Sequence, residues 1–530
     1  MLEPAWTRDT VETAWRDPLR LYRVGQRLLN ALMPSFTAVT AHAPYYWLYP
    51  WAIWSARDGS AAEARRLSIN VEKAYVLASL RNHAPNDCPL GAGVQGSSLI
   101  TDSALESSTV ALADLPWLGN LWGGLGQQYL GPLERTGLLE RPAGVPVITS
   151  AALEICTRAD RVLRETPLLR VAMSGEASSH DLDEIAAACC PCQAADNFAS
   201  VSAIVWDAWE RVRAEEPGGN SQANLLAFLK HLDDFASEHG FAVTGVGLRP
   251  IVYSGVWQFG GEAIPLATPP DLQPVQQTLR MILASHYAVH AFEGAFRGVL
   301  LAIRDGEVNL AAPADEVVRL ATEAGFTLQA KTSMGELWRA MTLPEPWQPR
   351  AEAWLDARVL EASSPGDCIA YSFLLLLTLL ARYRDLRRLP PGQSTPADQA
   401  WAALWYQSER LWDDLTFVHL YNRWRDSVAD QAIPDLTHDL TLLRHRHYVR
   451  QRGVPSLWVD YQEREGRTDR FEFRLDYDRA GANRPSWRVD NVVWMLKQMG
   501  RWKSEFQQAA AAELESDGEL ESEGAGDLEA

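Results

Sequence analysis

The chain has 530 residues, of which 47% are hydrophobic and 22% charged, so it is long enough for more than one globular core. Its formal net charge is −19, and eight acids stand between Glu513 and Glu529, which leaves −11 on the rest of the chain. This charge argues against a protein that coats nucleic acid nonspecifically, because such binding needs a broad positive surface. A local basic groove stays compatible with it.

Cysteine content and hydropathy indicate in which cellular compartment the protein is expected. Six cysteines in a chain of this length do not form a disulfide scaffold. Acids and arginines interrupt the first residues, so they do not resemble a signal peptide. The longest apolar run, 373–381, has about half the length that a bilayer-spanning helix needs. We therefore expect a cytoplasmic protein with no membrane segment.

The first 150 residues are expected to form an N-terminal helical domain with an aromatic-rich core. Helical periodicity runs over 9–34, and a second amphipathic pattern over 63–84 predicts another helix. The Gly-, Pro- and Ser-rich segment 85–100 predicts a loop. In 117–131 aromatic residues stand next to glycines, which indicates a helix broken by a close approach of backbones.

A central helical domain is expected over 151–388. The sequence "SSHDLDEIAAACC" predicts a helix whose N-cap is Ser179 or Asp181. Short apolar runs in 241–258 give the most strand-like pattern of this region, and 271–303 predicts one long helix.

The segment "LPPGQSTPADQ" marks the clearest boundary, after which a Trp-rich helical domain is expected over 389–508. Alternation around a polar turn in 456–478 predicts a β-hairpin, and 488–502 predicts a final helix. The acidic tail 509–530 has the composition of a disordered segment. The predicted fold class is a mainly α, multidomain helical protein with a small β-hairpin or winged-helix-like element near the C-terminus.

The segment "YYWLYPWAIW", 45–54, contains six aromatic residues and no charge. Such rings stack on nucleic-acid bases when cations are interleaved with them, but the nearest cation here is Arg57. A membrane belt would need a spanning segment beside it. We therefore interpret the segment as a turn at Pro50 that leads into a buried helix.

Three residues offer a metal-binding pattern on the predicted helix 271–303. His286, His290 and Glu293 have i, i+4 and i+7 spacing and so share one helical face. The common zinc-enzyme pattern places a general-base Glu between its two histidines, and this chain does not. Solvent-exposed or core-edge histidines are the alternative interpretation.

The sequence "CCPCQ" places Cys189, Cys190 and Cys192 together, with His180 as the nearest further ligand. Structural zinc sites prefer two or more residues between cysteines and usually a second pair. Buried, unreactive thiols after a helix are therefore the favoured interpretation.

The strongest basic patch is "RHRHYVRQRG", where arginines alternate with histidines and one tyrosine. Guanidinium groups match phosphate oxygens, and a tyrosine ring can stack on a base. A salt-bridged surface is the competing interpretation, because acids follow closely. The residues predicted to contact nucleic acid are Arg444, Arg446, Tyr448, Arg450 and Arg452.

Several segments resemble a family of large, uncharacterised bacterial proteins encoded in phage-defence islands. The segment "VTAHAPYYWLYPWAIW" is similar to a "tRARYfsFyPWiyw"-type segment of that family, although Pro44 departs from the pattern, which has an arginine before the aromatic pair. The resemblance extends to "VEKAYVLASLRNH", "GVQGSS", "LWGGLGQQYLGPLERTGLL" and "RFEFRLDYD…WRVDNVVWMLKQMG". It implies an accessory protein of an antiviral system whose partners are helicase, nuclease or ATPase subunits. It assigns no catalytic residue and no cofactor.

Two functions follow from these patterns. The favoured one is a non-catalytic subunit of a bacterial antiviral defence complex, which scaffolds partners and contacts DNA or RNA through the Arg-rich segment. The alternative is a metal-dependent hydrolase or nuclease that uses the His286 group or three acids near the hairpin, Asp476, Asp478 and Asp490. Phosphate-loop, dinucleotide-binding and serine-hydrolase motifs are not found in the sequence.

Overall fold

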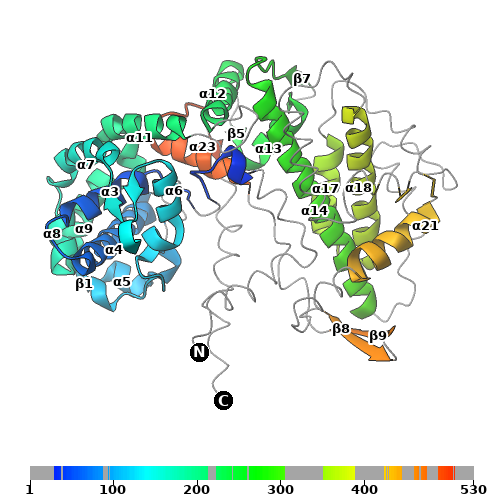
Figure 1. Cartoon of the computed structure of the whole chain (residues 1–530), viewed down its shortest axis with the longest axis horizontal. Helices are drawn as coiled ribbons and strands as arrows, with labels where there is room; N and C mark the ends of the chain where they lie inside the picture. Colours follow the sequence, from blue (N-terminus) through cyan, green and yellow to red (C-terminus); the bar gives the residue numbers. More distant parts are fainter. Residues whose placement is uncertain are drawn as a thin grey trace. The chain divides into compact units, whose positions relative to one another are not determined.

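The computed structural model shows a chain built mainly of helices (Figure 1). Of the residues that it describes, 73% are helical and 5% lie in strands, which confirms the predicted mainly α class. The described residues are 29–37, 40–86, 94, 96–212, 222–240, 243–259, 262–304, 350–387, 420, 423–424, 426–427, 429–443, 459–464, 467–473, 487–504 and 506–507.

Contacts divide the chain into two compact units. Unit one comprises 1–28 and 249–485, and unit two comprises 29–248 and 486–530. The predicted boundary at residue 150 falls inside unit two, where strand β1 (Thr109–Ala111) pairs with strand β4 (Glu176–Ser178). The C-terminal residues return to unit two, so its chain is not continuous in sequence. Each unit is described by itself below.

Helices make up most of the described part of unit two. They are α3 (Tyr45–Ser55), α4 (Ala61–Asn86), α5 (Asp102–Glu106), α6 (Leu130–Arg135), α7 (Ser150–Leu163), α8 (Leu168–Ser174), α9 (Ser179–Cys189), α10 (Ala194–Asn197), α11 (Ala199–Arg211), α12 (Gln222–His239) and α23 (Val489–Gln498). Short helical turns are η2 (Ser97–Leu99), η3 (Leu112–Asp114), the π-helical η4 (Leu125–Tyr129), η5 (Pro142–Gly144) and η6 (Pro191–Gln193).

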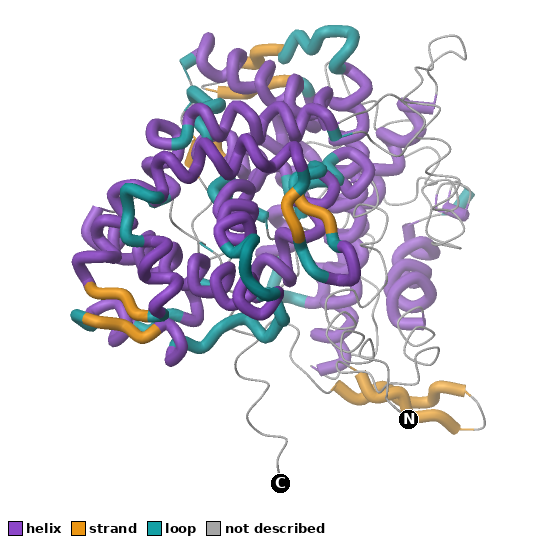
Figure 2. Tube along the Cα trace, turned by 60° about the vertical axis from the view of Figure 1, so that its left-hand side comes forward, coloured by secondary structure: helices purple, strands orange, loops and turns teal. Residues whose placement is uncertain are grey.

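The strands of unit two are short and paired in twos (Figure 2). β1 and β4 are antiparallel, as are β2 (Leu139–Glu140) and β3 (Val147–Ile148). β5 (Val243–Thr244) and β10 (Phe506–Gln507) are parallel.

Helix α3 lies in the core of unit two, which confirms the interpretation of the aromatic segment as a buried helix. Every residue from Tyr45 to Ile53 is buried, as expected for a helix that is uncharged on all faces. The helix packs against α4 and α7, and the Trp47 ring stacks on Phe198. Pro50 lies inside the helix and not in a preceding turn, so the expected turn is wrong.

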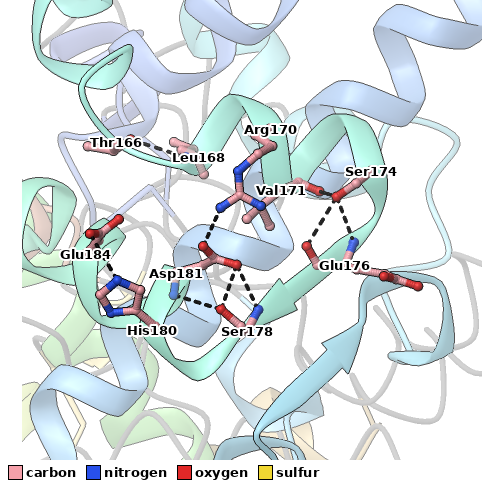
Figure 3. Close-up of polar contacts among 10 residues, drawn as sticks. All are labelled: Thr166, Leu168, Arg170, Val171, Ser174, Glu176, Ser178, His180, Asp181 and Glu184. Carbon is pink, nitrogen blue, oxygen red and sulfur yellow. Dashed lines mark hydrogen bonds and ion pairs between the residues drawn. The ribbon is translucent and has the colours of Figure 1, made fainter.

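The start of helix α9 is fixed by a reciprocal cap (Figure 3). The Ser178 hydroxyl accepts a hydrogen bond from the backbone N–H of Asp181, and the Asp181 carboxylate accepts one from the N–H of Ser178. Arg170 of α8 forms an ion pair with the same carboxylate. The N-cap is therefore Ser178 and neither Ser179 nor Asp181 as predicted, because Asp181 acts from the third helical position.

The C-terminal segment of unit two is held by one buried carboxylate. Asp233 of α12 is 1% exposed and accepts hydrogen bonds from the backbone N–H of Lys503 (2.9 Å) and of Ser504 (2.8 Å), and from the Ser504 hydroxyl (2.8 Å). The Gln498 side chain of α23 accepts a hydrogen bond from the backbone N–H of Ala43 at 2.8 Å. These bonds join the end of the chain to segments more than 250 residues earlier.

Unit one is organised around a long helix, α14 (Gln273–Arg304), which lies beside α17 (Arg350–Glu361) and α18 (Pro365–Arg387) (Figure 1). Glycine on α14 permits this close packing, since a Cβ at Gly294 would collide with side chains of α17 and α18. The expected helix over 271–303 is confirmed. The remaining described elements are α13 (Gly245–Ser254, which begins in unit two), β6 (Val256–Phe259), β7 (Glu262–Pro265), α21 (Ala429–Pro434), the π-helical η7 (Asp435–Leu443), β8 (Val459–Arg464) and β9 (Arg467–Phe473).

Two further expectations are tested by these elements. The predicted hairpin is confirmed, because β8 and β9 are antiparallel with Tyr461 opposite Phe471. The strand-like segment 241–258 contains strand residues at both ends, in β5 and β6, but its middle is the helix α13, so that prediction is confirmed only in part. Within the described ranges, no helix combines the length and apolar character needed to cross a bilayer.

We predict that Asp233→Ala loosens the C-terminal segment, because two backbone N–H groups, of which that of Ser504 is buried, lose their acceptor. The expected loss is about 2 kcal/mol, which raises hydrogen exchange at the amides of Lys503 and Ser504 about 30-fold. Exchange measured by mass spectrometry on the full chain tests this.

The neighbouring residue provides the control. Asp234 is half exposed and pairs with two exposed ammonium groups, that of Lys230 at 2.7 Å and that of Lys503 at 3.9 Å. Because exposed pairs of this kind contribute little stability, Asp234→Ala should change exchange by less than about threefold. Equal exchange in both variants would contradict the role given to Asp233.

Candidate functional site

The residues predicted as metal ligands lie on α14 and are buried in unit one. His286, His290 and Glu293 are 5%, 4% and 3% exposed. Nδ1 of His290 shares a 2.6 Å hydrogen bond with Oδ1 of Asp356, which comes from α17. Burial and the neighbouring His290 hold the pKa of His286 well below its usual value, so its ring is neutral.

These side chains do not form a metal centre in the part of the chain that the structure describes. No group of three or more His, Cys, Asp or Glu side chains there is arranged to hold a metal ion. His290 is instead engaged by a carboxylate that the helical spacing did not predict. The partner Asp356 is 66 residues away in sequence, so only the packing of α17 against α14 reveals it.

The basic segment lies outside the described residues. Arg444, Arg446, Tyr448, Arg450 and Arg452 fall in 444–458, between the end of η7 and the start of β8. Asp476 and Asp478 also lie outside, as does the acidic tail 509–530. Asp490, the third acid of that predicted set, lies in α23 of unit two.

The candidate functional site is a buried carboxyl group in unit two that sequence reasoning missed. Glu72 of α4 is 1% exposed, and its Oε2 accepts a hydrogen bond from the backbone N–H of Gly124 at 3.1 Å. Gly123 has a φ of +59°, and a Cβ there would lie 2.9 Å from Oε2 of Glu72. Glycine is therefore required for the turn before η4 to reach the carboxylate.

Four buried tyrosines surround this carboxyl group. The ring of Tyr45 lies 5.1 Å from that of Tyr49, 5.3 Å from that of Tyr75 and 4.9 Å from that of Tyr129. The Tyr129 hydroxyl exchanges hydrogen bonds with the backbone of residue 42. Among the described residues the Tyr45 hydroxyl finds no hydrogen-bond partner. The Tyr49 hydroxyl faces the Glu72 carboxyl group, and the Tyr75 hydroxyl faces Ser79.

Lys73 and Trp117 form the outer rim of the cluster. The Lys73 ammonium donates hydrogen bonds to the carbonyl oxygens of Leu112 (2.7 Å) and Leu115 (3.0 Å) and lies 5.7 Å from the centre of the Trp117 ring. The half-buried Trp117 ring also touches Gly96, where a Cβ would lie 2.7 Å from it. Trp117 is thus the partly exposed member that separates Glu72 from solvent.

Burial determines the charge state of the cluster. Loss of hydration raises the pKa of Glu72 to about 8, against the opposing effects of the Gly124 N–H, the nearby Trp117 and Tyr49 side chains, and Lys73. Burial and the charge of Glu72 raise the pKa of Tyr45 and of Tyr49 well above the usual value. At neutral pH the cluster therefore holds a protonated carboxyl group and neutral hydroxyls. It can accept or release one proton close to physiological pH.

Four of the sequence segments quoted above contribute residues to this cluster. The aromatic segment supplies Tyr45 and Tyr49, "VEKAYVLASLRNH" supplies Glu72, and "LWGGLGQQYLG" supplies Gly124 and Tyr129. The segment "GVQGSS" supplies the glycine that contacts Trp117.

Comparisons of the chain with protein-family models, with curated proteins and with solved structures give no match.

We predict that Glu72 makes the stability of the folded protein fall as pH rises. The folded state keeps the proton up to about pH 8 while an unfolded Glu releases it near its ordinary pKa of 4.5, so the folded state binds more protons between these values. The stabilisation is full below the unfolded pKa and is lost as pH rises through the folded pKa, by on the order of 5 kcal/mol. Glu72→Gln, which stays neutral, should remove this loss in urea unfolding measured at several pH values.

A second glutamate on α4 serves as the control. Glu63 is exposed, and hydrogen bonds from Ser60 lower its pKa, so its charged form contributes stability above the unfolded pKa that is lost in acid. Glu63→Gln should therefore leave the fall in stability between about pH 4.5 and pH 8 unchanged. Parallel stability curves for the wild type and Glu72→Gln would refute the buried, protonated carboxyl group.

Proposed function

We propose that the protein is a non-catalytic subunit of a bacterial antiviral complex, which scaffolds partner proteins and contacts nucleic acid through Arg444, Arg446, Tyr448, Arg450 and Arg452. The proposed nucleic-acid contact rests on one observation: within nine residues, arginine side chains alternate with the rings of histidines and a tyrosine. One guanidinium group can donate two parallel hydrogen bonds to the oxygens of a single phosphate. The tyrosine ring can stack on an unpaired base.

The neighbouring structure supports this assignment. The basic segment joins η7, which ends at Leu443, to β8, which begins at Val459, and η7 and the strand β9 both pack against α14. Of the two elements that flank the segment, η7 packs on the long helix directly and β8 is joined to it through its partner strand β9. A segment whose flanking elements are fixed loses less conformational entropy on binding than a free tail does.

The antiviral role and the partners are supported by the resemblance of the quoted segments to proteins encoded in phage-defence islands. Helicase, nuclease or ATPase subunits are the partners proposed on that ground. Mass spectrometry of the proteins that co-purify with the intact chain tests this part, and recovery of the chain alone from cells that carry the neighbouring genes would contradict it.

For the nucleic-acid contact, we predict that replacing the four arginines with alanine weakens binding of labelled DNA or RNA at least about tenfold at low salt. Each lost phosphate contact should also reduce the slope of log affinity against log salt concentration by about 0.9 on duplex DNA and about 0.7 on single strands. Fluorescence anisotropy over a salt series measures both quantities.

A matched variant separates a local contact from bulk charge. Replacing Arg57, Arg66, Arg161 and Arg211, which are exposed in unit two, removes the same four charges and should change affinity by less than about threefold. Wild-type affinity in the first variant, or equal losses in both, would refute the proposed contact.

A further inference from the structure

Two thiols lie in contact just after helix α9. Sγ of Cys190 and Sγ of Cys192 are 3.0 Å apart, with Pro191 between the two residues. The side-chain amide of Asn82, from α4, donates to both sulfurs, at 3.3 and 3.5 Å. Cys190 is 1% exposed, whereas Cys192 is only partly buried. One thiol of the pair is thus accessible and the other lies directly behind it.

We propose that Cys190 and Cys192 form a redox-active dithiol, which closes to a reversible disulfide by exchange with a low-molecular-weight disulfide such as oxidised glutathione. The bond requires the sulfurs to approach by about 1 Å, to a length of about 2.05 Å. This assignment replaces the interpretation of these residues as unreactive thiols. It is independent of the proposed function.

A zinc site fits this geometry less well. Two thiolates on one tetrahedral zinc ion lie about 3.8 Å apart, given Zn–S bonds of about 2.3 Å. Nor do the described ranges contain a set of three ligands for a metal ion.

The exchange proceeds in two balanced steps. The Cys192 thiolate attacks one sulfur of glutathione disulfide, which gives a mixed disulfide and releases one glutathione thiolate. The Cys190 thiol then loses its proton and attacks the Cys192 sulfur, which releases the second glutathione. Two protein thiols are oxidised to one disulfide, one glutathione disulfide is reduced to two thiols, and the two protons pass to the departing thiolates.

The surroundings assign these roles to the two sulfurs. Of these two sulfurs that of Cys192 is the one open to a reagent, whereas Cys190 is buried. The Asn82 amide donates to both sulfurs and so does not distinguish them. Burial and the adjacent Cys192 sulfur raise the pKa of Cys190 to about 12. Formation of the mixed disulfide removes any charge from Cys192, so Cys190 then ionises more readily and acts as the resolving thiol.

The test is disulfide mapping on the full chain. The protein is equilibrated over a series of reduced and oxidised glutathione ratios, quenched in acid, alkylated and digested with trypsin. All three neighbouring cysteines lie in the peptide 171–211. The proposal expects this peptide to carry three alkyl groups under reducing conditions and a single one, on Cys189, under oxidising conditions. Three alkyl groups at every ratio, or a disulfide that includes Cys189 or Cys88, would overturn it.

Single variants test the order of attack. Cys190→Ser should accumulate a glutathione adduct on Cys192 at least about tenfold faster than Cys192→Ser does on Cys190. Cys189→Ser is the matched control and should oxidise at the same glutathione ratio as the wild type. Equal rates in the first two variants would refute the assigned roles, and the wild-type mapping decides the proposal even where a variant does not fold.

Discussion

The burial of one aromatic helix beside one carboxyl group is the constraint on which unit two depends. Helix α3 carries no charge and hides every residue from Tyr45 to Ile53, so other elements must cover it on all sides. Its tyrosines bring hydroxyl groups into the core, where an ionised carboxylate would be costly. Glu72 is therefore protonated at neutral pH, because burial raises the pKa of its carboxyl group.

Much of this fold was predictable from periodicity and charge. The absence of charge in 45–54 predicts a buried helix, and the 3.6-residue period of 271–303 predicts α14. Alternation around a polar turn predicts the hairpin of β8 and β9. In 241–258 the β-branched and aromatic residues favour strands locally, but strands form only at the two ends of the segment and its middle is the helix α13.

The sites were less predictable, because each depends on contacts between distant segments. The helix pattern places Glu72 next to Lys73 as an ordinary charged pair, and only the turn that ends at Gly124 buries it. The spacing of His286 and His290 predicts that they share a helical face, but it does not predict the hydrogen bond between His290 and Asp356. Likewise, "CCPC" does not reveal which two sulfurs meet. No local sequence pattern predicts that the C-terminal segment hydrogen-bonds to Asp233.

The two units thus offer different kinds of chemistry. Unit two contains a titratable cluster and a pair of thiols that both contact α4, since Glu72 and Asn82 stand on the same helix. The sequence of unit one includes the basic segment that we propose to contact nucleic acid. The most direct test of the central claim is the infrared absorption of the Glu72 carboxyl group, taken as the difference between the wild type and Glu72→Gln over a pH titration. The account predicts a protonated carbonyl band that persists at neutral pH and disappears near pH 8. A band already lost near pH 4.5 would contradict it.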